Sequence, residues 1–149
     1  MGVTIGSNLP TAWAQYMGRA AAAWNNAGAK FRFEFVLDNK HKINLKSMPN
    51  YPLVLAMTHI YEGIGNYSTT DRDIDINSIF SWDVNGVSYK YDAWAVVTHE
   101  LGHWLTLDDL RSPFDTAATM YYQTGVGELR ARDLAADDVA GIKKIYGVR

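Results

Sequence analysis

Cysteine is absent from the 149 residues of this chain. That absence excludes disulfide bonds, thiolate nucleophiles and cysteine-ligated metal sites, so any metal ion must be held by histidine, aspartate or glutamate. An excess of basic residues is also missing, since the formal net charge is −2 and the pI is about 6.0. The charge balance therefore argues against nucleic acid and an anionic membrane surface as partners.

Long apolar runs are lacking as well. None approaches the roughly 20 residues that a membrane-spanning helix needs, so we expect no transmembrane segment. The first residues, Met1 to Thr4, show no basic stretch followed by an apolar segment and a cleavage site. No secretory signal is therefore visible, and export stays open at this point.

What the chain does have is enough apolar material for one core. Hydrophobic residues make up 48% and aromatic residues 13%, which suffices for a domain of ordinary size without external cross-links. We find no repeats, linker or low-complexity tract. The prediction is one domain over residues 1–149, monomeric, with no nucleic acid or membrane partner.

Hydrophobic periodicity predicts an α+β fold. The polar stretch around His41 and Pro49 is assigned no strand. The predicted elements, in chain order, are a strand at 3–5, a helix at 10–26, a half-buried strand at 31–36, a more fully buried strand at 53–61, a second β region at 64–76, a helix capped by Asp92 that begins at Ala93, a long irregular loop at 111–122 and a closing helix that ends at Gly147.

Two of these helices have predicted buried faces. In the first, the residues at three- and four-residue steps are Trp13, Met17, Ala20 and Trp24. In the closing helix, the apolar stripe is Leu134, Val139, Ile142 and Ile145. The central helix is apolar around most of its surface, with Val96, Val97, Leu101, Trp104 and Leu105 expected in the core.

That central helix carries the pattern HExxH, as His99-Glu100-Leu101-Gly102-His103. Residues four apart on a helix share a face, so both imidazoles can reach one metal ion. Glu100 is offset to the side, where its carboxylate can take a proton from a water molecule activated by zinc. A surface helix that carries two histidines by accident is the competing interpretation. Because the helix is otherwise apolar and needs a partner for its polar residues, the metal site is favoured.

The longer stretch HELGHWLTLDD, residues 99–109, resembles the extended metzincin pattern HExxHxxGxxH/D. The resemblance implies that Asp109 is the third zinc ligand, as in the similar snapalysin group of small metallopeptidases, and that the fourth position stays open for water. Thr106 replaces the usual glycine of the pattern. A β-branched residue at positive φ is an outlier, so we expect the turn to differ locally or to carry strain, and Asp108 is the alternative ligand.

Two downstream segments extend the resemblance. Residues 117–122, AATMYY, resemble the Met-turn of metzincins, with Met120 supporting the metal site. Residues 134–147, LAADDVAGIKKIYG, are similar to the closing helix of the matrixins. Together they imply a metzincin-like single domain: a twisted mixed sheet packed on an N-terminal helix and a zinc-binding helix, with a C-terminal helix after the Met-turn.

Tyr122 follows that methionine by two residues. In astacin-like and serralysin-like relatives, a tyrosine at this position can touch the metal or the tetrahedral intermediate, which makes Tyr122 a candidate catalytic residue. Matrixins usually have proline there. The alternative is that Tyr122 lines the specificity pocket, whose wall the resemblance assigns to residues 121–126, including Tyr121, with Val96, Val97 and Thr98 beneath.

The resemblance also implies a protein or peptide substrate that lies extended along an edge strand near residues 64–70. Calcium is a second candidate ion, because Asp71, Asp73 and Asp75 alternate along one strand face. A solvated strand face is the other interpretation of these aspartates, and His41 and His59 are interpreted as polar or core residues.

The function implied is that of a secreted zinc endopeptidase with Glu100 as general base. The alternative is a metal-binding or peptide-binding domain that keeps the fold without turnover.

Overall fold

The computed structural model describes residues 1–6, 8–36, 41–61 and 71–149. The elements in chain order are β1 (Gly2–Ile5), the 3₁₀ helix η1 (Thr11–Trp13), α1 (Ala14–Asn25), β2 (Glu34–Phe35), β3 (Lys42–Lys46), β4 (Ala56–Tyr61), β5 (Asp71–Asn77), β6 (Trp82–Asp83), β7 (Tyr91–Asp92), α2 (Ala93–Trp104), the 3₁₀ helix η2 (Arg130–Arg132) and α3 (Ala136–Tyr146).

The main sheet is mixed, with the strand order β2-β1-β3-β5-β4. Its strands run parallel except β4, which pairs antiparallel with β5 and forms one edge. In that pairing Thr58 stands opposite Ile74, and Ile74 is fully buried. Because directly opposed residues in a sheet share a face, Thr58 points to the same side as the core.

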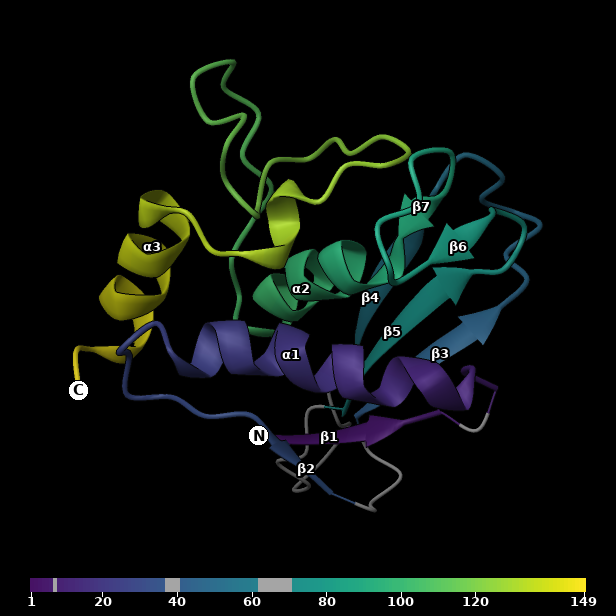
Figure 1. Ribbon diagram of the computed structural model, residues 1–149. Coiled ribbons are helices and arrows are strands. Elements are labelled where there is room, and N and C mark those ends of the chain that lie inside the picture. The colour runs from purple at the N-terminus through teal and green to yellow at the C-terminus, as the bar shows by residue number, and fades with distance from the viewer. Residues whose placement is uncertain (7, 37–40, 62–70) are drawn as a thin grey trace.

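Helices α1 and α2 lie side by side against the sheet, while α3 stands at the opposite end of the helical layer from β6 and β7 (Figure 1). The predicted faces of α1 and α2 are buried as expected. The indole nitrogen of Trp24 donates to the carbonyl of Thr98 at 2.8 Å, which fixes the two helices to each other inside the core.

The beginning of α2 is fixed by Asp92, as predicted. Its carboxylate accepts from the amide of Ala95 at 2.8 Å, and the guanidinium of Arg132 lies 2.5 Å from the same carboxylate. Asp92 is 3% exposed, and a buried charge needs partners. Arg132 and the amides at the start of the helix together supply them. The start of α2 is thereby tied to η2.

The closing helix α3 begins at Ala136 and ends before Gly147, which has φ 81°. Ile142 is fully buried, and Leu134 and Val139 are partly buried. The prediction for Ile145 was wrong, since this side chain is 46% exposed. The buried face of α3 therefore includes fewer residues than the helical spacing predicted.

Three strand predictions need correction. β3 lies in the stretch that was assigned no strand, although Ile43 and Leu45 alternate there with polar residues over five positions. The strand predicted at 53–61 begins only at Ala56, and Leu53 is 91% exposed rather than buried. The strand predicted at 31–36 is reduced to β2. The β region predicted from 64 is observed from Asp71 onward, and its earlier part lies outside the described residues.

The architecture agrees with the predicted fold class: an α+β domain with a mixed sheet and, in the described residues, three α-helices. Among the helices of the described segments, none combines the length and apolar character needed to span a bilayer.

Candidate metal centre and active-site cleft

The two histidines of α2 are oriented by backbone carbonyls. Nδ1 of His99 lies 2.8 Å from the carbonyl oxygen of Thr119, and Nδ1 of His103 lies 2.8 Å from that of Leu107. A carbonyl only accepts, so Nδ1 carries the proton in both rings and each neutral ring keeps its lone pair on Nε2. This is the tautomer that a metal ligand requires.

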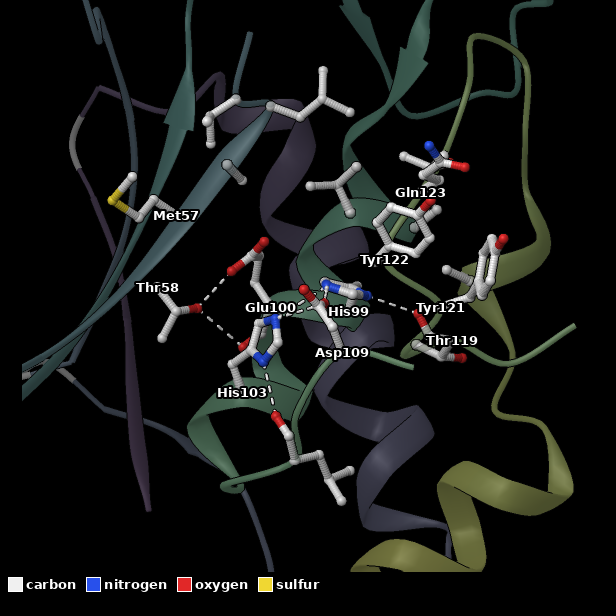
Figure 2. Close-up of a pocket in the computed structure, with 18 of the residues that line it drawn as sticks. Met57, Thr58, His99, Glu100, His103, Asp109, Thr119, Tyr121, Tyr122 and Gln123 are labelled. Atoms are coloured by element: carbon white, nitrogen blue, oxygen red, sulfur yellow. Dashed lines mark hydrogen bonds and ion pairs between the residues drawn. The ribbon is translucent and has the colours of Figure 1, made fainter. Parts of the chain in front are cut away.

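These Nε2 atoms converge with one carboxylate oxygen. The Nε2 atoms of His99 and His103 are 3.1 Å apart, and Oδ1 of Asp109 lies 3.3 Å from the first and 3.5 Å from the second. Ligands at about 2.0–2.1 Å in tetrahedral geometry around zinc are separated by about 3.3 Å. The three atoms therefore have the spacing of three corners of a zinc site (Figure 2).

The pKa values of His99 and Asp109 are shifted because the two side chains lie close together. Burial disfavours the charged form of His99, but the hydrogen bond with Asp109 and the nearby charge of Glu100 outweigh burial and raise its pKa. The hydrogen bond from His99 likewise lowers the pKa of Asp109. A divalent cation at this point would compete with a proton for the Nε2 atom of His99.

The turn after α2 delivers Asp109 to the histidines. Thr106 has φ 64° and is the one non-glycine residue with positive φ in the part of the chain that the structure describes. The amide of Thr106 donates to the carbonyl of His103 at 2.9 Å and that of Leu107 to the carbonyl of Gly102 at 3.1 Å, the hydrogen bonds of a Schellman motif. The expected strain at Thr106 is present, and the turn nevertheless has the form that glycine would give it.

Asp109, rather than Asp108, faces the histidines. Within the described residues no hydrogen bond or ion pair joins Asp108 to either ring, although Asp108 lines the same cleft. The second oxygen of Asp109 lies 3.2 Å from the guanidinium of Arg111. Leu110, which follows, exchanges backbone hydrogen bonds with Met120 and Tyr122 at 2.7 and 3.1 Å, so the segment of the third candidate ligand is attached to the segment around Met120.

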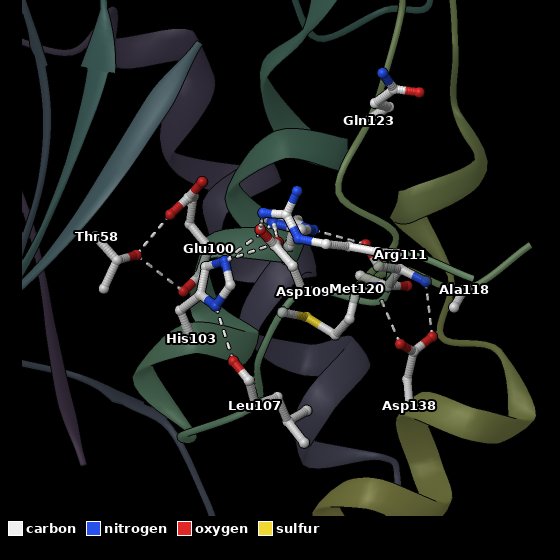
Figure 3. Close-up of polar contacts among 12 residues, drawn as sticks. Thr58, Glu100, His103, Leu107, Asp109, Arg111, Ala118, Met120, Gln123 and Asp138 are labelled. Atoms are coloured by element: carbon white, nitrogen blue, oxygen red, sulfur yellow. Dashed lines mark hydrogen bonds and ion pairs between the residues drawn. The ribbon is translucent and has the colours of Figure 1, made fainter. Parts of the chain in front are cut away.

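The segment around Met120 is held from below by Asp138 of α3. This carboxylate is 2% exposed and accepts from the amides of Thr119 at 2.8 Å and Met120 at 3.0 Å (Figure 3). The carbonyl of the same Thr119 receives the hydrogen bond of His99. The position of His99 therefore depends on a chain of contacts that reaches into the closing helix.

Gly102 allows this segment to approach α2. A Cβ at position 102 would overlap the sulfur of Met120 and come within 2.9 Å of the Trp24 ring. The missing side chain leaves room for Met120, which is 2% exposed, under the two histidines.

Glu100 lies beside the histidines and is 7% exposed. Ligand atoms of Glu100, His99 and His103 all fall within 4.8 Å of one another. Oε2 of Glu100 accepts a hydrogen bond from the hydroxyl of Thr58 on β4 at 2.6 Å. Thr58 thus contacts one of the two carboxylate oxygens of Glu100.

A cleft of about 950 Å³ opens over these residues between β4 on one side and the segments after α2 on the other. Val96, Tyr121 and Tyr122 line it, and Val97 and Thr98 are fully buried. Tyr122 is 40% exposed, and its ring lies 4.8 Å from the Arg111 guanidinium. The edge predicted for substrate at 64–70 lies outside the described residues.

The aspartates of β5 have partners of another kind. Asp75 is 1% exposed and lies 2.5 Å from the ammonium of Lys46 and 2.9 Å from Nε2 of His59. Asp73 accepts from the amide of Lys42 at 3.0 Å, and Asp71 lies 3.6 Å from Nδ1 of His41. Asp75 is therefore not part of a solvated face, and a cation of the protein already occupies its carboxylate. Calcium at these residues stays a prediction.

Sequence patterns did not identify Thr58, Asp138 or the carbonyls of Thr119 and Leu107 as parts of the site. A threonine in a strand and a carbonyl in a loop have no distinctive spacing. The paired aspartates at 137–138 were a visible signal, and only Asp138 turns out to be buried.

Comparison with known proteins gives two matches. The chain matches the matrixin family of peptidases over residues 10–147. Over 85 residues, which are 57% of this chain and 16% of the relative, it is 35% identical to a macrophage metalloelastase from Oryctolagus cuniculus. The matched part is thus a small fraction of that relative.

Proposed function

Because the chain belongs to the matrixin family, whose members are zinc-dependent metalloproteases, we propose that it is a zinc endopeptidase in which Glu100 acts as the general base. The convergence of two Nε2 atoms and one carboxylate oxygen beside Glu100, at the floor of an open cleft, supports this proposal most directly. We further propose that residues 1–149 form one catalytic domain, acting outside the cell as family members typically do.

The metal would be held by His99, His103 and Asp109. When bound, zinc would supply Lewis acidity, which makes a water molecule easier to deprotonate near neutral pH and polarises the scissile carbonyl. The backbone carbonyls of Thr119 and Leu107 keep both rings in the tautomer that ligates.

Glu100 performs the proton transfers. Its Oε1 has no hydrogen-bond partner among the described residues, so this oxygen is available to take a proton from the attacking water and to pass it to the leaving amine. The peptide substrate would lie extended beside β4, the edge strand of the sheet, and pair through its backbone. Tyr121, Tyr122 and Val96 would contact its side chains in the cleft.

Replacing Glu100 by Gln tests the proposal. We expect unchanged zinc content and a fall in kcat of about 100-fold or more, because the amide cannot accept the proton. Zinc is measured by metal analysis and cleavage with casein, with and without a chelator. Glu34→Gln is the matched control, since Glu34 is a well-exposed carboxylate on β2. Full activity in Glu100→Gln would rule out the assigned base.

The alternative function, a metal-binding or peptide-binding domain without turnover, would follow if Thr106 misplaced the third ligand. The distances from Asp109 to both histidines speak against that premise. A wild-type protein that binds zinc and leaves casein intact would nonetheless favour it.

A further inference from the structure

Thr58 connects the edge strand to the proposed base. It lies on β4 opposite the buried Ile74, so its side chain faces α2. Its hydroxyl is 2.6 Å from Oε2 of Glu100 and 3.3 Å from the carbonyl oxygen of the same residue (Figure 2). No pattern in the sequence points to Thr58.

The two contacts are unequal in strength. A threonine hydroxyl has one proton, so it can donate fully to one acceptor. Hydroxyl-to-carboxylate hydrogen bonds have typical lengths of about 2.5–2.7 Å and are about twice as strong as neutral ones. The contact to Oε2 falls in this range and the contact to the carbonyl does not. The hydroxyl of Thr58 therefore donates its hydrogen bond to the carboxylate of Glu100.

This hydrogen bond acts on a torsion that has little intrinsic preference of its own. The last torsion of a glutamate is broad, with no strong rotamer preference. Of the two oxygens of Glu100, Oε2 is taken by Thr58, and Oε1 is without a partner in the described parts of the chain. Fixing Oε2 against β4 removes that rotational freedom and leaves Oε1 as the oxygen that can meet a water molecule in the cleft.

We propose that Thr58 is a positioning residue for Glu100, which holds the carboxylate in the orientation that proton transfer requires. The proposal rests on the proposed function for its catalytic consequence, although the orientation itself can be measured without turnover. Because β4 also forms the edge of the cleft, the strand that would pair with substrate is the strand that orients the base.

The first experiment observes the carboxylate directly. The chain has four glutamates, Glu34, Glu62, Glu100 and Glu128, so selective ¹³C labelling gives four side-chain carboxyl resonances. The resonance of Glu100 is the one missing from Glu100→Gln. In metal-free protein at about pH 8, where carboxyl groups are ionised, we expect Thr58→Val to shift this resonance and Thr58→Ser to leave it near its original position. An unchanged resonance in Thr58→Val would overturn the proposal.

The second experiment measures turnover of the zinc-loaded protein. We expect Thr58→Val to lower kcat by about 10- to 100-fold, as for loss of a hydrogen bond to a charged group, with KM and zinc content unchanged because Thr58 touches neither histidine. Thr58→Ser restores most of kcat, since the hydroxyl returns. A purely structural role predicts loss of stability in both variants and no selective fall in kcat, and that result would refute positioning.

The two proposals fail in different ways. An inactive wild-type protein overturns the proposed endopeptidase function, and the carboxyl resonance then still decides whether Thr58 orients Glu100. An active wild type with equal kcat in Thr58→Val overturns only the role of Thr58.

Discussion

Two regions of this molecule bring histidines and aspartates together, and they differ in what neutralises the carboxylates. At the end of α2, two Nε2 atoms and Oδ1 of Asp109 lie within 3.5 Å of one another. On β5, the buried Asp75 already has the ammonium of Lys46 against it. Among the described residues no cation of the protein lies between the converging acceptors at α2, because Arg111 contacts the other oxygen of Asp109, whereas Lys46 contacts the buried Asp75 directly. Residue types alone do not separate the two; their partners do.

The largest effect expected from this comparison is the loss of a histidine. If an apparent binding free energy of about 10–16 kcal/mol is shared by three or four ligands, one ligand corresponds to about 1,000-fold in zinc affinity. We expect His103→Ala to lose that much and His59→Ala, on β4, to lose none. Competition titration with a chromophoric chelator measures both. Equal losses would mean that the two regions do not differ as described.

Exchanging the aspartates sharpens the contrast. Asp109→Asn should weaken zinc binding by tenfold or more with less than about 1 kcal/mol effect on the metal-free fold, because the carboxylate is partly exposed. Asp75→Asn should leave zinc affinity intact and cost about 1 kcal/mol of unfolding free energy, because Asp75 is buried but its partner Lys46 is half exposed. Zinc titration and urea unfolding of each variant give both quantities. Zinc loss in Asp75→Asn would contradict the assignment.

Backbone strain is found beside the first region. Thr106, at φ 64°, lies between His103 and Asp109. Relief of the left-handed conformation by Thr106→Gly gains about 1–2 kcal/mol, and the freer unfolded chain takes back about 0.5–1 kcal/mol. We therefore expect a net gain of about 0.5–1 kcal/mol in unfolding free energy. Thr11→Gly, in η1, is the control and should destabilise. A loss of stability in Thr106→Gly would show that the threonine contributes contacts that outweigh its strain.

The smallest expected effect concerns pH. The hydrogen bond to Asp75, the largest influence, raises the pKa of Lys46 above 10.5. A raised pKa means that this contribution to stability is fully present below pH 10.5 and is lost as the pH rises through the folded pKa. Because Lys46 is half exposed, the contribution is under about 1 kcal/mol. The difference in unfolding free energy between wild type and Lys46→Met, measured by urea unfolding, should stay constant from pH 7 to about 9.5 and shrink above 10.5.

The stabilisation by zinc, in contrast, should grow with pH across the range where histidines lose their protons, because metal binding releases them. Thermal unfolding in buffers from about pH 5 to 8, with zinc and with chelator, measures this. A zinc effect that is independent of pH would contradict ligation by His99 and His103.

The parts of the molecule that could be predicted are those in which the spacing of apolar residues and the capping residues indicate the same element. The faces of α1 and α2, the cap at Asp92 and the end of α3 at Gly147 follow from helical spacing and end residues, and all are observed. The two histidines were brought together by a spacing of four, which a helix converts directly into proximity.

The parts that were missed depend on tertiary contacts. β3 does alternate, with Ile43 and Leu45 between polar residues, but the pattern covers five residues and only Ile43 is fully buried. Leu53 reads as part of a buried strand, but β4 starts three residues later. Thr58 and Asp138 act on Glu100 and His99 through the register of β4 and the packing of α3, which are set by the fold as a whole.

The turn that ends α2 also limits how this chain can change. Between His103 and Asp109 the path is closed by two backbone hydrogen bonds from Thr106 and Leu107, so the number of residues in it is fixed even though their identities are not. Inserting or deleting one residue there would move Asp109 by about 3.5 Å along the chain, farther than the separation of the ligand atoms tolerates. The five residues 104–108 can therefore change in identity but not in number.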